Sequence, residues 1–295
     1  MTVRFGIGAP SALPELLHTA EQADRDGLDH LSIADHPYGA HALDAYAAIA
    51  FVLARTERIS ALVNVTNLPL RPAPILARTA STLATASGDR FVLGLGAGGA
   101  PDRITAMGGR QQTPREAVDA FEEAMVLIRA LTTPGPAVTS AGPHYPVKGI
   151  PPVAAPGLQI WTGSNGPRSL AATGRQADGW IPGHAADWLN AVYQKSRPII
   201  DAAALEVGRK PSDVATIYNF PGAITDRPLD RTRDDEGRWI GGSVGQWVEE
   251  LTGAVLEHGA AGFTYFPRGD ASYESSLSRW SQEIAPAVRK RIQRP

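Results

Sequence analysis

The sequence has no cysteine, little net charge and no long apolar run, and each absence excludes a class of protein. Without cysteine the chain forms no disulfide, uses no catalytic thiol and offers no thiolate to a metal. The net charge is −2, with acidic and basic residues mixed along the chain. This balance argues against a nucleic-acid partner, which would require a basic stripe to neutralise phosphates.

Signals for a membrane or for export are also missing. The longest clean apolar run lies between Asp44 and Arg55 and is too short to span a bilayer. The N-terminal stretch MTVRFGIGAP lacks the apolar core of a secretory signal. Because 43% of the residues are hydrophobic, the chain can bury a sizeable core. We expect a soluble, cytoplasmic protein that acts on a small molecule.

The sequence does have a regular alternation of short β-branched runs and helical patterns. The runs predicted as strands are residues 3–9, 28–34, 59–65, 90–96, 158–164, 177–182, 214–220 and 262–267. Eight strands, each followed by a helix, are typical of an α/β protein with a (β/α)8, or TIM, barrel. No change in composition marks a linker, so residues 1–295 are predicted to form one domain. The segments 133–157 and 226–242 are predicted to be loop insertions.

The stretch FVLGLGAGG, residues 91–99, contains the glycine pattern of a dinucleotide-binding turn. Gly94, Gly96 and Gly99 spell G-x-G-x-x-G, a pattern that in a nicotinamide enzyme joins the first strand to the first helix. Here the pattern ends the fourth predicted strand. The acid at the required distance, Asp119, lies inside a predicted helix instead of after a strand. The sequence therefore argues against the doubly wound fold.

A barrel gives these glycines another role. The carboxyl ends of barrel strands form the active site, so residues 96–99 are expected at the mouth of the barrel. Backbone amides at Ala97 and Gly98 would support a flat ligand directly, because little side chain intervenes. Tight packing between strand and loop is an equally simple explanation, and the sequence leaves both open.

Polar residues also follow the second and third predicted strands. Asp35 and His36 end the second strand, and the segment 64–67 ends the third. His36 is a candidate general acid beside a carboxylate, since imidazole titrates near neutral pH. A purely structural histidine is the alternative.

The fifth predicted strand leads into a small, polar loop and a helix that begins at Pro167. The N-terminus of a helix presents free N–H groups and the positive end of the helix dipole, which attract anions. The residues predicted to bind a phosphate-bearing ligand are Gly163, Ser164, Asn165, Gly166, Pro167, Arg168 and Ser169. Simple capping of the helix is the alternative.

A metal site is a weaker hypothesis. Asp35, His36, His41 and Asp44 are ligand types that lie close together in the sequence. Metal-dependent barrels usually draw ligands from several strands, and the end of the first strand, FGIGAP, offers none. We predict no metal.

Several stretches, in this order, resemble the bacterial luciferase-like superfamily. They are ADHP (34–37), VTNLPLRPAPILARTASTL (65–83), SGDRFVLGLGAGG (87–99) and WTGSNGPRSLAATGRQADGW (161–180). The closer resemblance is to the branch of oxidoreductases that use coenzyme F420, a deazaflavin. The similarity is strong over residues 3–182 and weaker from Ile240 to Pro267.

The resemblance implies a (β/α)8 barrel that holds a flavin or deazaflavin at its mouth without a metal. Asp35 is then expected to hydrogen-bond the deazaflavin ring, and His36 becomes the candidate catalytic residue. A non-proline cis peptide is expected between Asn64 and Val65, in a bulge that backs the ring. The neighbouring residues expected to bind cofactor are Thr66, Asn67, Ala97 and Gly98, and residues 163–169 match the phosphate loop of the family.

The sequence departs from the sugar-phosphate dehydrogenases of this branch at two positions. Their catalytic glutamate is replaced by Gly99, and an aromatic residue after the histidine is missing, with Ala40 in that region. Glucose 6-phosphate is therefore not expected as the substrate. We expect hydride transfer between deazaflavin C5 and another small organic molecule. The alternatives are an FMN-dependent monooxygenase and, less favoured, a non-catalytic deazaflavin-binding protein. Families of this kind often form homodimers.

Overall fold

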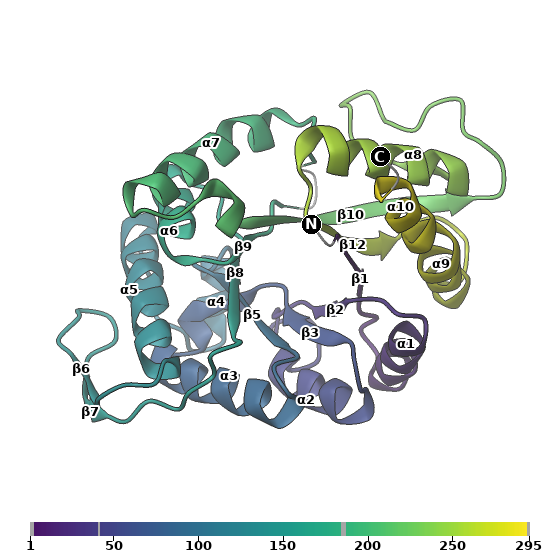
Figure 1. Ribbon diagram of the computed structural model, residues 1–295. Coiled ribbons are helices and arrows are strands. Elements are labelled where there is room, and N and C mark those ends of the chain that lie inside the picture. Colours follow the sequence, from purple (N-terminus) through teal and green to yellow (C-terminus); the bar gives the residue numbers. More distant parts are fainter. Residues whose placement is uncertain (1–2, 41, 184–186, 294–295) are drawn as a thin grey trace.

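The protein is a closed barrel of parallel strands surrounded by helices, seen in a computed structural model that describes residues 3–40, 42–183 and 187–293 (Figure 1). The barrel strands are β1 (Arg4–Gly8), β2 (His30–Ile33), β3 (Ser60–Val63), β5 (Phe91–Gly96), β8 (Gln159–Thr162), β9 (Gly179–Trp180), β10 (Ala215–Thr225) and β12 (Gly262–Pro267). Pairing of β9 with β10 closes the ring. All eight predicted strands are present, and the predicted (β/α)8 barrel is confirmed.

The helices lie outside the strands and bury one face each. The long ones are α1 (Leu13–Arg25), α2 (Ala45–Arg55), α3 (Ala73–Ser87), α5 (Pro114–Thr132), α6 (Pro167–Gln176), α7 (Ala191–Glu206) and α8 (Val244–His258). The chain ends in α9 (Tyr273–Arg279), a π-helical turn (Trp280–Ile284) and α10 (Ala285–Ile292). Thr113 and Glu116 form a capping box that starts α5, and Ser243 and Gln246 form one that starts α8.

Shorter elements follow the carboxyl ends of β3 and β5, at the mouth of the barrel: β4 (Thr66–Asn67), the 3₁₀ turn Leu68–Leu70 and α4 (Pro101–Ala106). A second 3₁₀ turn, Pro211–Asp213, precedes β10. The helix α4 begins two residues after Gly99. No helix in the described part of the chain is long and apolar enough to cross a membrane.

Both predicted insertions contain extended structure. The segment 133–157 holds an antiparallel hairpin of β6 (Val138–Ser140) and β7 (Val147–Ile150), which projects away from the barrel (Figure 1). The segment 226–242 is a long loop that leads into β11 (Gly241–Ser243), which pairs with the end of β10. Arg233 ties this loop to the barrel through ion pairs with Asp187 and Glu250.

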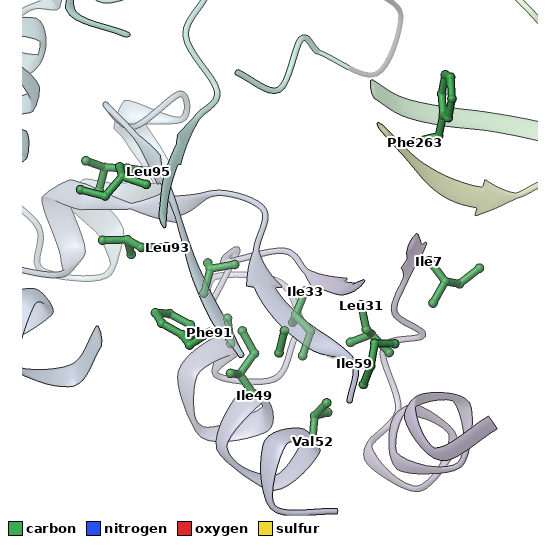
Figure 2. Close-up of a cluster of buried hydrophobic side chains, with 14 of the residues drawn as sticks. Ile7, Leu31, Ile33, Ile49, Val52, Ile59, Phe91, Leu93, Leu95 and Phe263 are labelled. Carbon is green, nitrogen blue, oxygen red and sulfur yellow. The ribbon is translucent and has the colours of Figure 1, made fainter. Parts of the chain in front are cut away.

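The core lies between the strands and the surrounding helices. Figure 2 shows Phe91, Leu93 and Leu95 of β5 in this cluster, together with Ile49 and Val52 of α2. The side chains of Ile49 and Val52 are fully buried. Complete burial of an aliphatic side chain stabilises a fold by about 1.5–3 kcal/mol. This packing fixes the strands whose carboxyl ends form the site below.

Candidate functional site

A cavity of about 580 Å³ lies at the carboxyl ends of the barrel strands. This end of a TIM barrel carries the active site in characterised enzymes of the fold. The predicted site residues that line the cavity are Asp35, His36, Asn64, Val65, Thr66, Asn67, Ala97, Gly98, Gly163, Ser164, Asn165 and Ser169. Segments that are far apart in the sequence therefore meet here, as predicted from the polar and small residues at the ends of the strands.

The floor of the cavity contains the bulge after β3. The peptide bond between Asn64 and Val65 is cis, as the family resemblance implied. The Asn64 amide donates a hydrogen bond from Nδ2 to Oδ1 of Asn219 at 2.8 Å, which connects the bulge to β10 across the barrel. After the bulge the chain pairs with β5, with Thr66 opposite Leu95.

The glycines of β5 leave room for this bulge. A Cβ atom on Gly94 would lie 1.7 Å from the carbonyl oxygen of Val63, and one on Gly96 would lie 2.7 Å from Val65 Cγ2. By contrast, a Cβ on Gly99 would meet no atom within 4 Å, and Gly99 lines the cavity. Tight packing therefore explains the first two glycines, whereas Gly99 leaves open space at the cavity wall.

Asp35 is completely buried and is held by Arg71. The Arg71 guanidinium donates from Nε to Asp35 Oδ2 at 2.8 Å and from Nη2 to Oδ1 at 2.7 Å. The backbone N–H of Asn67 donates a third hydrogen bond to Asp35, to Oδ2 at 3.0 Å. Burial alone would lower the pKa of Arg71, but its hydrogen bonds to Asp35 and Asp44 outweigh burial and raise it. Arg71 is therefore a permanent cation within this pair.

The same guanidinium contacts further side chains. Arg71 Nη2 donates to Asp44 Oδ2 at 2.8 Å, and its Cζ lies 4.5 Å from the centroid of the Tyr46 ring. Tyr46 in turn hydrogen-bonds Thr66 through its hydroxyl at 2.6 Å. These contacts join the segment after β2, the start of α2 and the segment after β3 into one polar network, buried at Asp35 and open to solvent at Asp44.

This network bears on the metal hypothesis. Arg71 lies between Asp35 and Asp44, the two carboxylates that a metal would have needed. His41 lies outside the described residues. Within the described ranges no group of three or more histidines and acids is placed to hold a metal ion.

His36 lies on the cavity wall with an exposed side chain. Its imidazole stacks on the ring of Tyr38, with centroids 5.6 Å apart and an interplanar angle of 21°. The Cζ atom of Arg103, from α4, lies 5.5 Å from the centroid of the same Tyr38 ring. Tyr38 and Arg103 also line the cavity, so three side chains form a layered wall.

The predicted phosphate loop divides into two parts. Gly163, Ser164, Asn165 and Ser169 line the cavity, whereas Gly166, Pro167 and Arg168 are not among its lining residues. Helix α6 begins at Pro167, as predicted, and no side chain caps its first turn. Arg168 donates to Asp119 at 2.5 Å and lies 3.6 Å from Glu122. Its charge is thus shared with two acids of α5.

Sequence reasoning missed several lining residues: Tyr38, Ala100, Arg103, Phe121, Ile181, Pro182, Gly183 and Asn219. Asn219 lies near the end of the seventh predicted strand, so the rule used for the other strand ends could have found it. Arg103 was missed because the prediction for this part of the mouth stopped at residues 96–99, whereas Arg103 lies on the short helix that follows them.

Curated relatives share the sequence pattern over much of the chain. An F420-dependent glucose-6-phosphate dehydrogenase from Microbacterium testaceum is 30% identical over 245 residues, which cover 78% of this chain and 72% of that protein. A phthiodiolone/phenolphthiodiolone dimycocerosates ketoreductase from Mycobacterium tuberculosis is 31% identical over 184 residues. That match covers 61% of this chain and only 45% of the length of the ketoreductase.

Solved structures share the fold at low sequence identity. The coenzyme F420-dependent tetrahydromethanopterin reductase from Methanopyrus kandleri superposes with a TM-score of 0.81 at 17% identity, covering 98% of this chain and 100% of that one. The FMN complex of the oxygenating constituent of 3,6-diketocamphane monooxygenase from Pseudomonas putida gives a TM-score of 0.76 at 18% identity, covering 97% and 99%. The family described as luciferase-like monooxygenase matches residues 2–282. The chain therefore belongs to the luciferase-like monooxygenase family of oxidoreductases.

Proposed function

We propose that the protein is a coenzyme F420-dependent oxidoreductase that transfers a hydride between the deazaflavin and a small organic substrate. The observation that carries the proposal is the cavity itself. Its floor is the backbone bulge at Asn64–Val65, and Gly163 approaches that bulge so closely that a Cβ on it would lie 3.1 Å from Val65 Cγ2. A surface built from backbone and small side chains suits a flat, polycyclic ring.

Several residues have the chemistry to hold such a ring and its tail. A carboxylate offers about four acceptor positions, and three donors reach Asp35 in this structure. These donors leave one acceptor position on Oδ1 unused, and the proposal assigns it to a donor on the ring. The uncapped first turn of α6, together with Ser164 and Ser169, supplies donors for a phosphate.

The bound deazaflavin would supply a carbon that gives or accepts a hydride, and the chain would supply position and a proton. Stacking against a fixed floor provides proximity and orientation, which account for much of the acceleration in such reactions. The His36 imidazole lies on the cavity wall and makes no side-chain hydrogen bond to another described residue, so its nitrogens are available to the substrate. We assign His36 as the candidate acid or base.

The choice of F420 over FMN rests on the Asp35–His36 pair and on the relatives. Both curated relatives described above are reductases or dehydrogenases, and one is named as F420-dependent. Glucose 6-phosphate is not the proposed substrate, because Gly99 and Ala40 stand where the sugar-phosphate enzymes have functional side chains. An FMN-dependent monooxygenase is the second candidate, since the matching family is described as monooxygenases and one structure of the same fold is a monooxygenase in complex with FMN.

The experiment is to titrate the purified protein separately with F420 and with FMN, following cofactor fluorescence. Tighter binding of F420, followed by reoxidation of reduced F420 with carbonyl, imine or alkene substrates, supports the proposal. Preferential FMN binding with oxygen consumption supports the monooxygenase. F420 binding without hydride exchange over a broad substrate panel indicates a binding protein.

The role of His36 has its own test. His36→Ala is expected to lower turnover well beyond any effect on F420 affinity, because the side chain is proposed to act on substrate. Equal losses in turnover and affinity reduce His36 to a binding residue. His36→Gln keeps a hydrogen-bonding side chain that does not titrate, and separates proton transfer from positioning.

A further inference from the structure

We propose that Arg103 binds an anionic group of the substrate, a carboxylate or phosphate, at the mouth of the cavity, and that Tyr38 positions Arg103 for this contact. The inference rests on the proposed function only in taking this cavity as the substrate site. It adds a substrate class, organic anions, and a residue that selects it.

The cavity contains few charged groups. Among its described lining residues, only Asp35 and Arg103 bear a full charge at neutral pH, with His36 as the remaining titratable base. The Asp35 charge is compensated by Arg71, with two hydrogen bonds under 3 Å. Arg103 makes no ion pair with any described residue. The cavity therefore presents one uncompensated cation and favours a negatively charged partner.

Arg103 is held in a fixed position at the barrel mouth. Its helix, α4, is fixed beside the barrel mouth by Ile104, which is 3% exposed. Ile104 packs so closely on Gly98 that a Cβ there would lie 3.1 Å from Ile104 Cδ1. Gly99 precedes the helix and leaves open space, so no side chain at that position shields the guanidinium from a ligand.

Tyr38 orients the guanidinium of Arg103. The Arg103 guanidinium lies against the Tyr38 ring, and the His36 imidazole stacks on that same ring. A cation–π contact restricts the guanidinium without using its N–H donors. Those donors can then bind carboxylate or phosphate oxygens in pairs, which is the geometry that arginine favours. An anion held there would share this cavity wall with His36, the candidate acid or base.

The cofactor also carries negative charge, so the source of the anion must be distinguished. The predicted phosphate loop, 163–169, follows β8 and runs into α6, whereas Arg103 belongs to α4, which follows β5. Arg103 shares its wall with His36 and Tyr38 of the segment after β2. This wall is where the reacting part of a substrate is proposed to lie, and we therefore assign the anion to the substrate.

The test uses benzoate, phenyl phosphate and the neutral benzamide as probes, measured by ligand-observed NMR with the protein alone and with F420 bound. The wild type is expected to bind at least one of the anions about tenfold more tightly than benzamide, the usual effect of a charge-assisted hydrogen bond. Arg103→Gln removes this preference, and Arg103→Lys retains part of it. Arg110→Gln is the matched control, since Arg110 is 69% exposed and lies outside the cavity lining.

Tyr38 is tested as a positioning residue. Tyr38→Phe keeps the ring face and is expected to keep the preference for anions, whereas Tyr38→Leu reduces it. Binding of benzamide should be the same in both variants, which a general collapse of the cavity would not allow. Equal anion binding by Tyr38→Phe and Tyr38→Leu would refute the role of the ring.

Two results overturn the substrate assignment. One is a wild type that binds the anions no better than benzamide. The other is an Arg103→Gln variant that loses affinity for F420 but not for the ribityl deazaflavin without phosphate, which would assign the guanidinium to the cofactor tail. Failure of the proposed function is a separate result: F420 then does not bind, while the probes still report on the protein alone.

Discussion

Arg71 holds both carboxylate oxygens of Asp35, a side chain with no exposed surface. Removal of one member of a buried ion pair leaves an uncompensated charge, which costs about 3–5 kcal/mol. Arg71→Leu is therefore expected to lower the free energy of unfolding by about that amount, measured by urea denaturation.

Two further variants serve as controls for this loss. Arg55→Leu breaks an ion pair with Glu21 whose arginine is 58% exposed, and is expected to cost less than about 1 kcal/mol. Arg71→Leu combined with Asp35→Asn removes both charges and is expected to recover part of the stability. If Arg71→Leu lowers the free energy of unfolding no more than Arg55→Leu does, the pairing of Arg71 with the buried Asp35 does not stabilise the fold as argued here.

The contrast between Gly94 and Gly99 gives a second prediction. A Cβ at Gly94 would overlap the Val63 carbonyl oxygen, a backbone atom that cannot rotate away. Gly94→Ala is expected to destabilise the protein by about 2 kcal/mol or more, or to prevent its accumulation in soluble form. Gly99→Ala, with no atom within 4 Å of the new methyl, should unfold at nearly the same urea concentration as the wild type. Equal stability of the two variants would contradict the packing argument.

These two glycines also show how far the sequence could lead. Alternation of apolar runs predicted every barrel strand, because strands buried on both faces need continuous apolar residues. The order of the strands then placed residues 96–99 at the mouth of the barrel. The local sequence could not distinguish a glycine needed for close packing, such as Gly94, from a glycine beside an open cavity, such as Gly99. The atoms close to Gly94 belong to Val63 of β3, some thirty residues earlier in the chain.

The partners of the site residues were harder to predict than the residues themselves. Asp35 was found from its place after a strand, but its pairing with Arg71 depends on the turn after β4, which has no periodicity. Arg168 was predicted to donate to a phosphate from its place at a helix N-terminus. Its pairing with Asp119 arises from the packing of α6 on α5, which only the three-dimensional structure defines.

His30 gives a prediction about pH. It is 1% exposed inside the barrel, where Nε2 lies 2.8 Å from Thr264 Oγ1 and Nδ1 has no partner among the described residues. Burial, with a smaller contribution from Arg4, lowers the pKa of His30 to about 3. The unfolded chain takes up a proton near pH 6.5, whereas the folded protein does not until about pH 3. Folding is therefore disfavoured increasingly as the pH falls between these values.

The measurement compares the wild type with His30→Gln, which does not titrate, in urea denaturation at pH 7, 6, 5 and 4. Below pH 6 the wild type should lose stability relative to the variant by up to about 1.4 kcal/mol for each pH unit. Carboxylates titrate in both proteins, so the difference between the two curves isolates His30. A constant difference from pH 7 to pH 4 would contradict the lowered pKa.

The pairing of Arg168 with Asp119 gives a test of the phosphate loop that does not depend on the substrate. A hydrogen bond from Arg168 lowers the pKa of Asp119, so the carboxylate is ionised at neutral pH and competes with a phosphate for the guanidinium. If Arg168 binds the cofactor phosphate, Asp119→Asn should tighten F420 binding several-fold, and Arg168→Gln should weaken it.

Both effects should shrink at high salt, because the groups are partly exposed and salt screens their interaction. Neither variant should change the affinity for the ribityl deazaflavin that lacks phosphate. Unchanged F420 affinity in both variants would show that Arg168 serves only to join α6 to α5, and that the phosphate is left to the backbone amides, Ser164 and Ser169.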